Sequence, residues 1–588
     1  MLWLPQRIPM KQQIEALLRQ ALTQLAIGCP IPAITIERPK DSAHGDFSTN
    51  IALILAKAAK MPSRALAEHL LQHIHADSAL FKISIAGPGF INFTLSQTCL
   101  IQQGQDLWRS PTCGLTPTPT TTTVVIDYSS PNLAKEMHVG HLRSTIIGDA
   151  IANTLEAKGY RIIRQNHVGD WGTQFGMLLA HLEDQDHTQS ANIVLHDLED
   201  FYKAAKQRFD ADTAFADRAR EKVVLLQSGN RHCVSAWSTF IQLSLTHCQQ
   251  IYQRLGVALQ PGDVRAESAY NDSLPKIVET LREQGLLTES DGSLCVFLDE
   301  FKGKNNEPLP IIVQKRDGGF LYASTDLAAI NYRQHELHAD RILYIVDARQ
   351  ALHFQQVFSL AYTAGFASPS LKLEHIPFGM VLDKTGKPYK SRDGGVTKLS
   401  DLLDEAEKRA KALIASRASS ASFSHKELEH MATVLGIASV KYADLSKNRE
   451  SDYIFDWDTM ISFDGNTAPY LLYACTRIQS LLQKAGVTDK MLDEAPFILQ
   501  DEHEQRLLKQ LLLFPEIIDL IIERSTPNTL CTYLYDLAGA FSTFYESCPI
   551  VNQSDYSIRS SRLKLSTLTA RILKKGLSLL GISTLQRM

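Results

Sequence analysis

Several features that define whole classes of proteins are missing from this sequence. Its nine cysteines are scattered, odd in number and contain no Cys-x-x-Cys pair, the spacing typical of redox motifs and zinc ligands. Free thiols in a reducing cytoplasm fit this pattern best, so disulfides and zinc are not expected. We predict no metal site built by the protein itself.

Long apolar runs and a strong charge of one sign are also absent. No segment approaches the roughly 18 apolar residues of a membrane span, and the apolar residues 1–9 are too short and too proline-broken for a signal peptide. We therefore expect a soluble cytoplasmic protein with no membrane partner. The formal net charge of -4 and the pI near 6.6 give no overall basic character, so any contact with RNA must come from local patches.

What the sequence does contain describes a protein of several domains. Its 588 residues, of which 44% are hydrophobic and 21% charged, exceed what one hydrophobic core usually supports. The patterns divide into an α+β region over residues 1–115, an α/β region over 116–400 with a helical insertion at about 181–290, and an all-α region over 401–588. The expected fold class is α/β and multidomain, with a doubly wound, Rossmann-like central domain.

The first region predicts a small, separate α+β domain. Helical periodicity begins at Met10, strands are expected at residues 34–37, 81–85 and 90–95, and two helices at about 51–60 and 64–73. A threonine- and proline-rich linker follows at residues 116–123. From the residues alone, a purely structural role for this domain is as good an interpretation as a functional one.

The central region opens with a strand, a loop, a helix and a second strand. Residues 123–128 are β-branched and apolar, residues 142–158 carry apolar side chains at helical spacing up to Gly159, and an apolar run follows at 160–164. Further strands are expected at 309–313, 319–322 and 341–346, with a helix beginning near Ser324. This alternation predicts a parallel sheet whose loops lie at its carboxyl edge, where nucleotides bind.

His138 and His141 stand at the start of that first helix with Gly140 between them. At this spacing both imidazoles can lie on one side of the first turn, where backbone N–H groups and the helix dipole favour an anion. Because Gly140 has no Cβ, a flat base could approach the backbone closely. We predict a phosphate-binding site, although two surface histidines at a helix start are the ordinary alternative.

Longer motifs around this pair resemble one enzyme family. Residues 131–145, Pro-Asn-Leu-Ala-Lys-Glu-Met-His-Val-Gly-His-Leu-Arg-Ser-Thr, resemble the His-Ile-Gly-His region of class I aminoacyl-tRNA synthetases and are similar to arginyl-tRNA synthetases in particular. Residues 44–50, 87–92, 167–176, 442–448, 452–457 and 465–470 also resemble that family, which covers nearly the whole chain. The resemblance implies an N-terminal domain that touches the corner of tRNA and a helical anticodon-binding domain at the C-terminus.

Selection of arginine requires a carboxylate that pairs with the guanidinium, and Asp326 is the candidate. The resemblance implies that Asp326 and Tyr322 contact the guanidinium end, and it implies Asn132, Asn166 and Gln350 nearer the amino and carboxylate groups. We expect all five to meet at one sheet edge. The alternative for Asp326 is a helix cap, which Ser324 or Thr325 could also supply.

A second phosphate-binding loop is expected at residues 378–395, where lysines and glycines predict a cationic loop that closes on triphosphate. Here the resemblance implies ATP contacts from Gly379, Met380, Val381, Lys387 and Ser391. The family's Lys-Met-Ser-Lys-Ser motif is degenerate: Ser391 stands where its second lysine belongs, and a register shifted by one residue puts Lys390 there instead. In the family a lysine at the position of Lys135 is thought to substitute. A solvated hairpin is the alternative.

The C-terminal region interleaves aromatic and basic residues and ends in a helical stretch with several lysines and arginines, from Arg562 to Lys575. Stacking aromatics beside cations suit unstacked RNA bases. From the residues alone, buried tyrosines and a solvated charged face are the more common explanation. The resemblance implies that Tyr470, Tyr473 and Met588 contact the anticodon.

The resemblance implies an arginine-tRNA ligase. L-arginine and ATP would give arginyl-adenylate and pyrophosphate, and the 3′-terminal ribose of tRNA-Arg would take the arginyl group, with activation requiring bound tRNA. Mg²⁺ is expected with ATP, without a dedicated protein site, and a monomer is expected. The rivals are a nucleotidyltransferase acting on small molecules, against which the helical region argues, and a non-catalytic RNA-binding protein, which His138, His141 and Asp326 disfavour.

Overall fold

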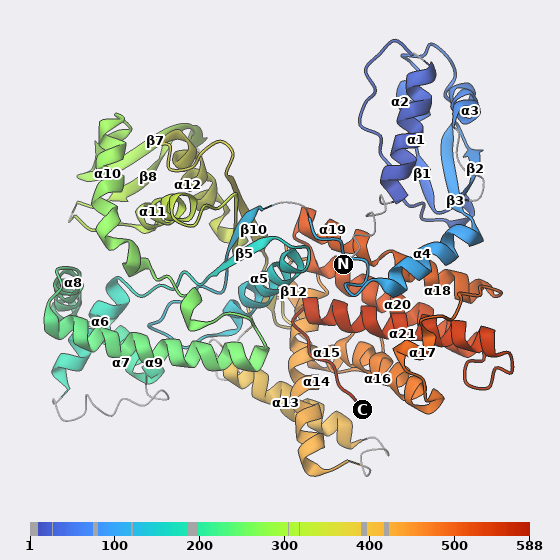
Figure 1. The fold of residues 1–588 in the computed structure, drawn as a ribbon. Helices are drawn as coiled ribbons and strands as arrows, with labels where there is room; N and C mark the ends of the chain where they lie inside the picture. Colours follow the sequence, from blue (N-terminus) through green and yellow to red (C-terminus); the bar gives the residue numbers. More distant parts are fainter. Residues whose placement is uncertain are drawn as a thin grey trace. The chain divides into compact units, whose positions relative to one another are not determined.

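The computed structural model describes residues 10–25, 27–74, 80–118, 121–185, 198–303, 305–316, 318–389, 397–416 and 423–588. The chain forms two compact units (Figure 1). The first comprises Met1–Gly114, Gly486–Leu513 and Ala540–Leu568, and the second comprises Leu115–Ala485, Phe514–Gly539 and Thr569–Met588. Helices of the C-terminal region therefore contribute to both units.

The N-terminal part of the first unit is a three-stranded antiparallel sheet covered by helices. Its elements are α1 (Met10–Leu25), β1 (Phe47–Thr49), α2 (Ile51–Leu55), α3 (Ser63–His73), β2 (Phe81–Ala86), β3 (Phe90–Leu95) and α4 (Gln97–Arg109), with strand order β1-β3-β2. The strands at 81–85 and 90–95 are confirmed. The strand expected at 34–37 is wrong, because only Glu37 pairs there, with Ser48, while β1 takes the place beside β3.

The same unit contains α17 (Asp489–Leu492), α18 (Glu502–Leu512) and parts of α20 (Pro527–Ser547) and α21 (Tyr556–Leu579). Two of the basic residues of α21, Arg562 and Lys564, are buried. Lys564 is 0% exposed and donates to Gln105 Oε1 at 3.1 Å and the Ala495 carbonyl at 2.7 Å, while Arg562 pairs with Glu504 at 2.7 Å. These two residues hold elements together, so they do not belong to a solvated basic face.

The second unit is built around a parallel sheet of four strands. These are β4 (Thr123–Asp127), β5 (Arg161–Gln165), β9 (Arg341–Asp347) and β10 (Lys372–Phe378), in the order β10-β9-β4-β5. Helix α5 (Val139–Ala157) connects β4 to β5, and α12 (Ala351–Thr363) connects β9 to β10 in the opposite direction across the sheet. Right-handed crossovers in opposite directions put the two helices on opposite faces. The predicted doubly wound fold is confirmed.

One predicted strand is present but belongs to a different sheet, and another predicted strand is wrong. Residues 308–314 form β8 (Pro308–Gln314), which belongs to a separate antiparallel sheet, β6-β7-β8, with β6 (Leu287–Ser290) and β7 (Ser293–Lys302). Residues 319–322 contain only the Gln314–Phe320 bridge before α11 (Tyr322–His335) begins. An apolar run shows that a segment is buried, but the identity of its partner strand is a tertiary property.

Strand β10 was not predicted from the sequence, because it contains charged and polar residues and a proline, which are uncommon in strands: Lys372, Glu374, His375 and Pro377. Proline removes a backbone donor and is tolerated mainly in edge strands, and β10 is the last strand of its sheet. Its alternation is also weak, since only Ile376 and Phe378 are fully buried.

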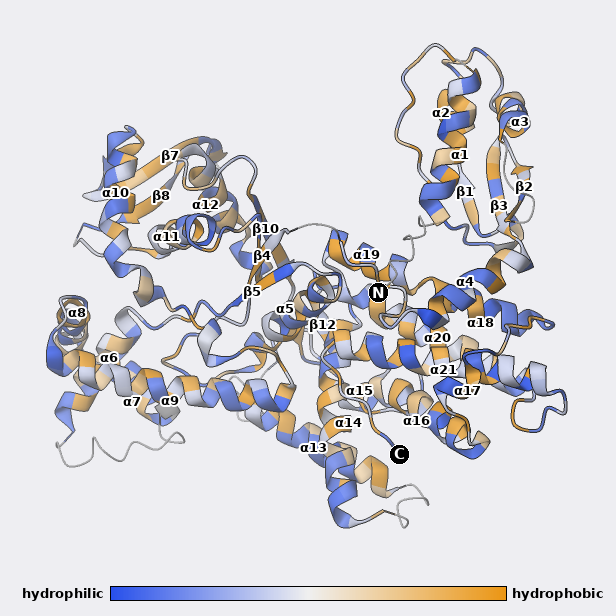
Figure 2. Cartoon of the chain, viewed as in Figure 1, coloured by the Kyte–Doolittle hydropathy of each residue, from blue (hydrophilic) through white to orange (hydrophobic). Residues whose placement is uncertain are grey.

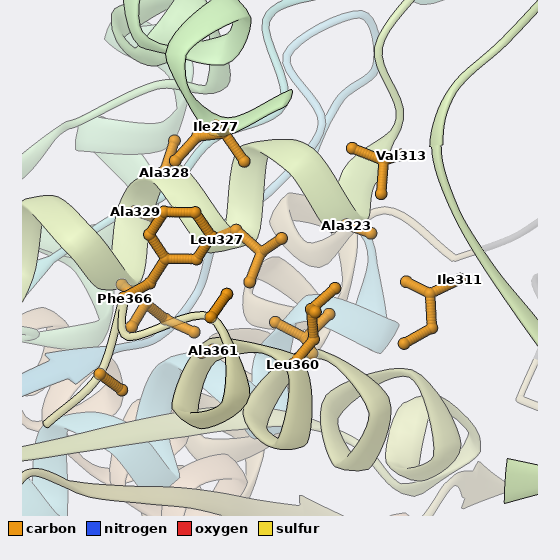
Figure 3. Close-up of a cluster of buried hydrophobic side chains, with 14 of the residues drawn as sticks. Ile277, Ile311, Val313, Ala323, Leu327, Ala328, Ala329, Leu360, Ala361 and Phe366 are labelled. Carbon is orange, nitrogen blue, oxygen red and sulfur yellow. The ribbon is translucent and has the colours of Figure 1, made fainter. Parts of the chain in front are cut away.

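The core on one face of the sheet joins both sheets through helices. Leu327, Ala328 and Ala329 of α11 belong to one cluster with Ile277 of α10 (Leu274–Glu283) and Leu360 of α12 (Figure 3). Val125 of β4 and Ile342 of β9 belong to the same cluster. This packing fixes the first turns of α11 and α12 against the carboxyl edge of the main sheet.

The segment after β5 is largely helical, and its helices are amphipathic (Figure 2). They are α6 (Thr173–Asp184), α7 (Leu198–Ala211), α8 (Thr213–Gln227) and α9 (Arg231–Leu255), followed by the 3-10 turns η3 (Pro261–Asp263) and η4 (Glu267–Ser273). The chain then enters α10. In the part of the chain that the structure describes, no helix has the length and apolarity needed to cross a membrane.

Beyond the sheet, the second unit becomes helical. Its elements are α13 (Leu399–Ala415), α14 (His425–Leu445), α15 (Trp457–Met460), α16 (Ala468–Ala485) and α19 (Phe514–Arg524), with the short parallel pair β11 (Val381–Leu382) and β12 (Tyr453–Ile454). Buried ionic contacts tie α14 to α5. Arg143 of α5 and Asp444 of α14, both about 1% exposed or less, pair at 3.1 Å. The helical part is thereby anchored directly to the helix that begins at the histidines.

Candidate active site

A cavity of about 890 Å³ opens at the carboxyl edge of the main sheet, where the chain leaves β4 and β9 in opposite directions. Such a point is the usual ligand site of an open α/β sheet. Predicted residues that line it are Asn132, His138, Gly140, His141, Tyr322, Asp326, Gln350, Gly379, Met380 and Val381. The structure therefore brings together side chains from four separate stretches of the chain.

The two histidines occupy the start of α5 in a reciprocal arrangement. His138 is the N-cap residue, and its Nδ1 accepts the Gly140 N–H at 3.1 Å. His141 Nδ1 accepts the N–H of His138 at 3.1 Å, and the ring centroids lie 3.9 Å apart. Because each Nδ1 accepts a backbone proton, each neutral ring carries its own proton on Nε2. Each Nε2–H group can act as a hydrogen-bond donor.

Burial keeps His141 neutral. Desolvation, followed by the charge of His138, lowers the pKa of His141 to about 3. A neutral imidazole with its proton on Nε2 donates a hydrogen bond without being a general acid at neutral pH. The arrangement suits positioning of a phosphate more than proton transfer.

Gly140 has a local reason to lack a side chain. A Cβ at this position would lie 2.8 Å from His138 Cε1 and 2.9 Å from Nδ1. An alanine would therefore push the His138 ring out of its cap position. The sequence suggested room for a base, and the structure adds that the glycine makes room for the histidine itself.

The opposite wall is the segment from Gly379 to Val381, which is held by backbone contacts. Gly379 N–H donates to the Arg449 carbonyl at 2.9 Å, and Met380 N–H donates to Asp452 Oδ1 at 2.6 Å. A Cβ on Gly379 would meet Asp452 Oδ1 at 2.6 Å. The pairing of β11 with β12 extends this contact, so the helical part of the chain supports one wall of the cavity.

Both ends of the predicted cationic loop lie at the site. Residues 381–389 form a hairpin in which the Asp383 N–H donates to the Lys387 carbonyl and the Lys387 N–H donates to Asp383 Oδ1, and Lys387 itself is exposed. At the far end, Val139 N–H donates to the Thr397 carbonyl and Leu399 N–H donates to the Met137 carbonyl. The predicted residues Lys390 and Ser391 lie outside the described residues.

Lys135 lies outside the lining of the cavity and contacts the helical insertion. Its Nζ stands 4.9 Å from the ring centroid of Tyr202 on α7, a cation–π contact. The side chain is exposed, yet its charge contributes to the lowered pKa of His141 after burial and His138. Lys135 is thus within electrostatic reach of the histidines.

Two carboxylates lie at the other end of the cavity. Asp326 occupies the first turns of α11 with Tyr322, and its Oδ2 lies 2.6 Å from His353 Nε2. It is not a helix cap, because Leu321 holds that position and Ser324 Oγ donates to the Val313 carbonyl. The pKa of Tyr322 is raised by desolvation and then by the charges of Glu267 and Asp326, and all three residues line the cavity.

Glu267 is the residue that sequence reasoning missed. It begins the turn η4, lines the cavity, and its pKa is raised to about 8 by desolvation, then by Asp170 and Asp326. The ionised form of a partly buried acid beside a second carboxylate is stabilised when a cation lies between them. No local pattern marked it, because a glutamate in an irregular segment is ordinarily a surface residue.

The remaining predicted residues divide into two groups. Asn132 and Gln350 line the cavity, Asn132 after β4 and Gln350 as the N-cap residue of α12. Asn166 is 1% exposed and lies behind this surface, where its Oδ1 accepts the Ser130 N–H at 2.9 Å and its Nδ2 donates to Tyr252 at 3.0 Å. Its observed contacts support the loop that carries Asn132.

A buried ion pair lies beneath the cavity. Arg333, which is 0% exposed, donates to Asp127 Oδ2 and Gln165 Oε1, each at 2.6 Å, and Asp127 lines the cavity floor. The two opposite charges neutralise each other at the ends of two strands. The carboxylate of Asp127 is therefore paired with Arg333.

The aromatic residues predicted to contact RNA behave differently from one another. Tyr473 on α16 is 40% exposed, and Tyr470 lies one turn before it with its ring centroid 5.3 Å from that of Tyr535. Met588 is half-buried. Tyr442 of α14, another aromatic residue of the C-terminal region, is 0% exposed, and its hydroxyl contacts Asn466 and the Cys531 carbonyl, so this tyrosine belongs to the core.

Comparison with protein families gives three matches along the chain. Residues 112–457 match the model described as "tRNA synthetases class I (R), catalytic domain", residues 471–588 match the DALR anticodon binding domain, and residues 12–95 match the arginyl tRNA synthetase N terminal domain. The three matches follow the order of the three regions predicted from the sequence.

Individual relatives agree with these matches. The chain is 57% identical to an arginine–tRNA ligase of Idiomarina loihiensis and 54% identical to one of Psychromonas ingrahamii, covering 98% of this chain and 100% of each relative. Among solved structures, arginyl-tRNA synthetase of Plasmodium falciparum superposes with a TM-score of 0.85 at 27% identity, covering 98% of this chain and 99% of the other. That of Thermus thermophilus gives 0.81 at 22% identity, covering 98% and 100%, which supports the fold.

Proposed function

Because the chain belongs to the arginyl-tRNA synthetases of class I, and is therefore an arginine–tRNA ligase that uses ATP, we propose how its residues divide the work. The cavity has a donor end at the histidines and an acidic end at Asp326 and Glu267. ATP phosphates would lie at the first end and the guanidinium at the second. The α-carboxylate of arginine would then face the α-phosphate between them, which is the geometry that adenylate formation needs.

At the phosphate end, we propose that the Nε2–H groups of His138 and His141 stabilise charge that develops on the α-phosphate. Preorganised donors act most strongly in a site that excludes water. Gly140, Gly379, Met380 and Val381 would shape the nucleotide pocket. Lys387 and Ser391 would contact the triphosphate, and either Lys390 or Lys135 would supply the cation of the family's second lysine.

Mg²⁺ would arrive bound to the phosphates of ATP. The described side chains at the phosphate end are imidazoles, and the nearby carboxylates of Asp127 and Asp347 are already paired with Arg333 and Arg349. Hard cations prefer several oxygen ligands, so a dedicated protein site does not fit this wall. When bound with ATP, the ion would neutralise phosphate charge.

At the acidic end, we propose that Asp326 and Glu267 hold the guanidinium between them, with Tyr322 beside it and Asn132 and Gln350 nearer the amino and carboxylate groups. A planar guanidinium has donors on several sides and can satisfy two carboxylates together. Asn166 would act indirectly, by fixing the loop that carries Asn132.

We propose that tRNA-Arg binds through three regions, over residues 1–115, 116–400 and 401–588, with Tyr470, Tyr473 and Met588 at the anticodon. Aromatic rings near the surface stack well on unpaired bases. We further propose that the enzyme works as a monomer in the cytoplasm.

The single observation that carries this proposal is the pair of carboxylates, Asp326 and Glu267, in the same cavity as the histidine pair. The test is pyrophosphate exchange into ATP with arginine, lysine or citrulline, with and without tRNA. Exchange that depends on arginine and on tRNA supports the proposal. Exchange with citrulline at a comparable rate would contradict a role for the carboxylates, because the neutral urea group gains nothing from them.

A further inference from the structure

His353 lies in the arginine pocket, yet nothing in the proposed binding scheme uses it. It sits one turn after Gln350 on α12, lines the same cavity, and its Nε2 is 2.6 Å from Asp326 Oδ2 on α11. The side chains of His353 and Asp326 are 31% and 15% exposed. The contact therefore bridges two helices in a partly desolvated site, where a hydrogen bond to a charged group is strong.

Only one oxygen of Asp326 is engaged by this contact. Among the described residues, Oδ1 has no hydrogen-bond partner, while Oδ2 is held by the imidazole. A carboxylate that is fixed at one oxygen cannot rotate freely, so its other oxygen has a defined direction toward the cavity. Preorganisation of this kind lowers the entropy cost of binding.

The charge of His353 depends on what else occupies the pocket. The charged or titratable groups around it are Asp326 and Tyr322 from α11, Glu267 from η4 and Arg349 from its own segment, while Phe354 stacks on His375 of β10. Burial alone would lower the pKa of His353, but the hydrogen bond and charge of Asp326 outweigh it, and the net direction is upward. An imidazolium beside Asp326 already neutralises the carboxylate that the substrate needs.

We propose that His353 is a positioning residue for arginine selection: it holds Oδ2 of Asp326 through its Nε2–H, and the incoming guanidinium binds the other carboxylate oxygen and displaces the proton on Nδ1 of the imidazolium. This rests on the proposed role of Asp326. In the bound state neutral His353 keeps its Nε2–H donated to Asp326 and carries no competing charge. The proton leaves to the solvent, so binding of one arginine cation is coupled to release of a proton.

The sign of the pH dependence follows from this coupling. The pKa of His353 is raised in the free enzyme and is lowered when a guanidinium binds beside it. Arginine affinity therefore increases as pH rises toward and through the pKa of the free enzyme. Glu267, with a pKa near 8, releases its proton in the same direction, so the two contributions must be separated by substitution.

The experiment compares two neutral replacements that differ in reach. The amide nitrogen of glutamine falls near the position of Nε2, whereas that of asparagine falls near Nδ1 and cannot reach Asp326. We expect His353→Gln to keep arginine KM within about threefold at pH 9, and His353→Asn to raise it by about tenfold or more. Titration calorimetry of the full-length enzyme with arginine, in two buffers of different ionisation enthalpy, counts the protons released.

Fewer protons released by His353→Gln than by the wild type, and a flatter dependence of arginine affinity on pH, would support the proposal. Glu267→Gln separates the contribution of that acid, and His335→Gln, the same change at the exposed end of α11, should match the wild type in both readouts. An unchanged proton count and pH profile in His353→Gln, together with equal KM values for the two variants, would overturn the inference. If Asp326→Asn also leaves arginine KM unchanged, the proposed arginine site itself fails.

Discussion

At the scale of single residues, the histidine pair illustrates how a cap can become a phosphate site. His138 and His141 each accept a backbone proton, so the helix start fixes their tautomers before any ligand arrives. Because burial lowers the pKa of His141 to about 3, this residue stays neutral throughout the physiological range. A loss of rate at acid pH with an apparent pKa of about 6.5, the ordinary value for histidine, should therefore come from a group other than His141.

Substitution of either histidine tests this role. We expect His138→Ala or His141→Ala to lower kcat by about 100-fold or more, while arginine affinity changes little, because the lost donors act on the phosphate in the transition state. Single-turnover adenylate formation is the measurement. His430→Ala, at an exposed position of α14, is the control, and near-normal turnover in the site variants would remove the pair from the mechanism.

The carboxylate of Asp326 gives the second prediction at this scale. Asp326→Asn removes one of the two carboxylates proposed to hold the desolvated guanidinium, so we expect a loss of about 3 kcal/mol or more, or over 100-fold in arginine KM. Steady-state aminoacylation at varied arginine concentration measures it. A variant that loses thermal stability while keeping its arginine KM would show that Asp326 only links α11 to α12.

At the scale of elements, the start of α5 depends on one glycine. In Gly140→Ala the new Cβ would meet the His138 ring at 2.8 Å, so the ring must leave its cap position. We expect kcat to fall by about tenfold or more, since a displaced donor loses most of its effect.

The control for this change is Gly539→Ala in α20, where an added Cβ meets nothing within 4 Å. Alanine is favoured over glycine inside a helix by about 1 kcal/mol, so this variant should keep its activity and melt slightly higher. Equal activity in both variants would mean that the His138 ring tolerates displacement.

The two loops that face each other across the site give another prediction at this scale. Lys135→Ala should slow adenylate formation severely if Lys135 serves the triphosphate in place of the family's second lysine, whose position the resemblance assigns to Ser391. Adding Ser391→Lys to that variant should restore part of the rate, a non-additive result expected if both positions serve one phosphate. The rate of adenylate formation is measured by pre-steady-state kinetics. A wild-type rate in Lys135→Ala alone would contradict a role for Lys135 at the triphosphate.

At the scale of the whole molecule, Lys441 joins segments that are remote in the chain. It is 0% exposed, and its Nζ donates to the carbonyls of Leu255 at 2.7 Å and Gly581 at 2.6 Å. The first carbonyl ends α9 of the insertion, and the second opens the segment that leads to Met588. One buried ammonium thus fixes the insertion, α14 and the C-terminal segment of the second unit together.

Replacement of this lysine should weaken the whole assembly. Lys441→Met leaves two buried carbonyls unpaired, which costs about 2 kcal/mol or more, so thermal unfolding should begin at a lower temperature. Lys447→Met, an exposed position just beyond α14, is the matched control. Equal melting of both variants would show that water replaces the ammonium without loss.

The sequence alone determined the doubly wound class, the first strand–loop–helix unit and the position of the histidine pair. These depend on local properties: β-branched runs, helical spacing and a glycine at a helix end all act within a few residues. The extended motifs carried the resemblance to the synthetase family for the same reason, since each motif is contiguous. Their residues keep their chemistry wherever the surrounding chain goes.

Only the tertiary structure decided which distant residues meet. Contacts between distant parts of the chain set the partner strands of β8, the edge position of β10 and the burial of Lys564 and Arg562. They also bring Glu267 and His353 to the cavity that contains Asp326. Desolvation and pairing in such contacts depend on neighbours that no local pattern encodes. Glu267 and His353 read as ordinary polar residues in the sequence, and it is folding that encloses them beside the carboxylate that would select arginine.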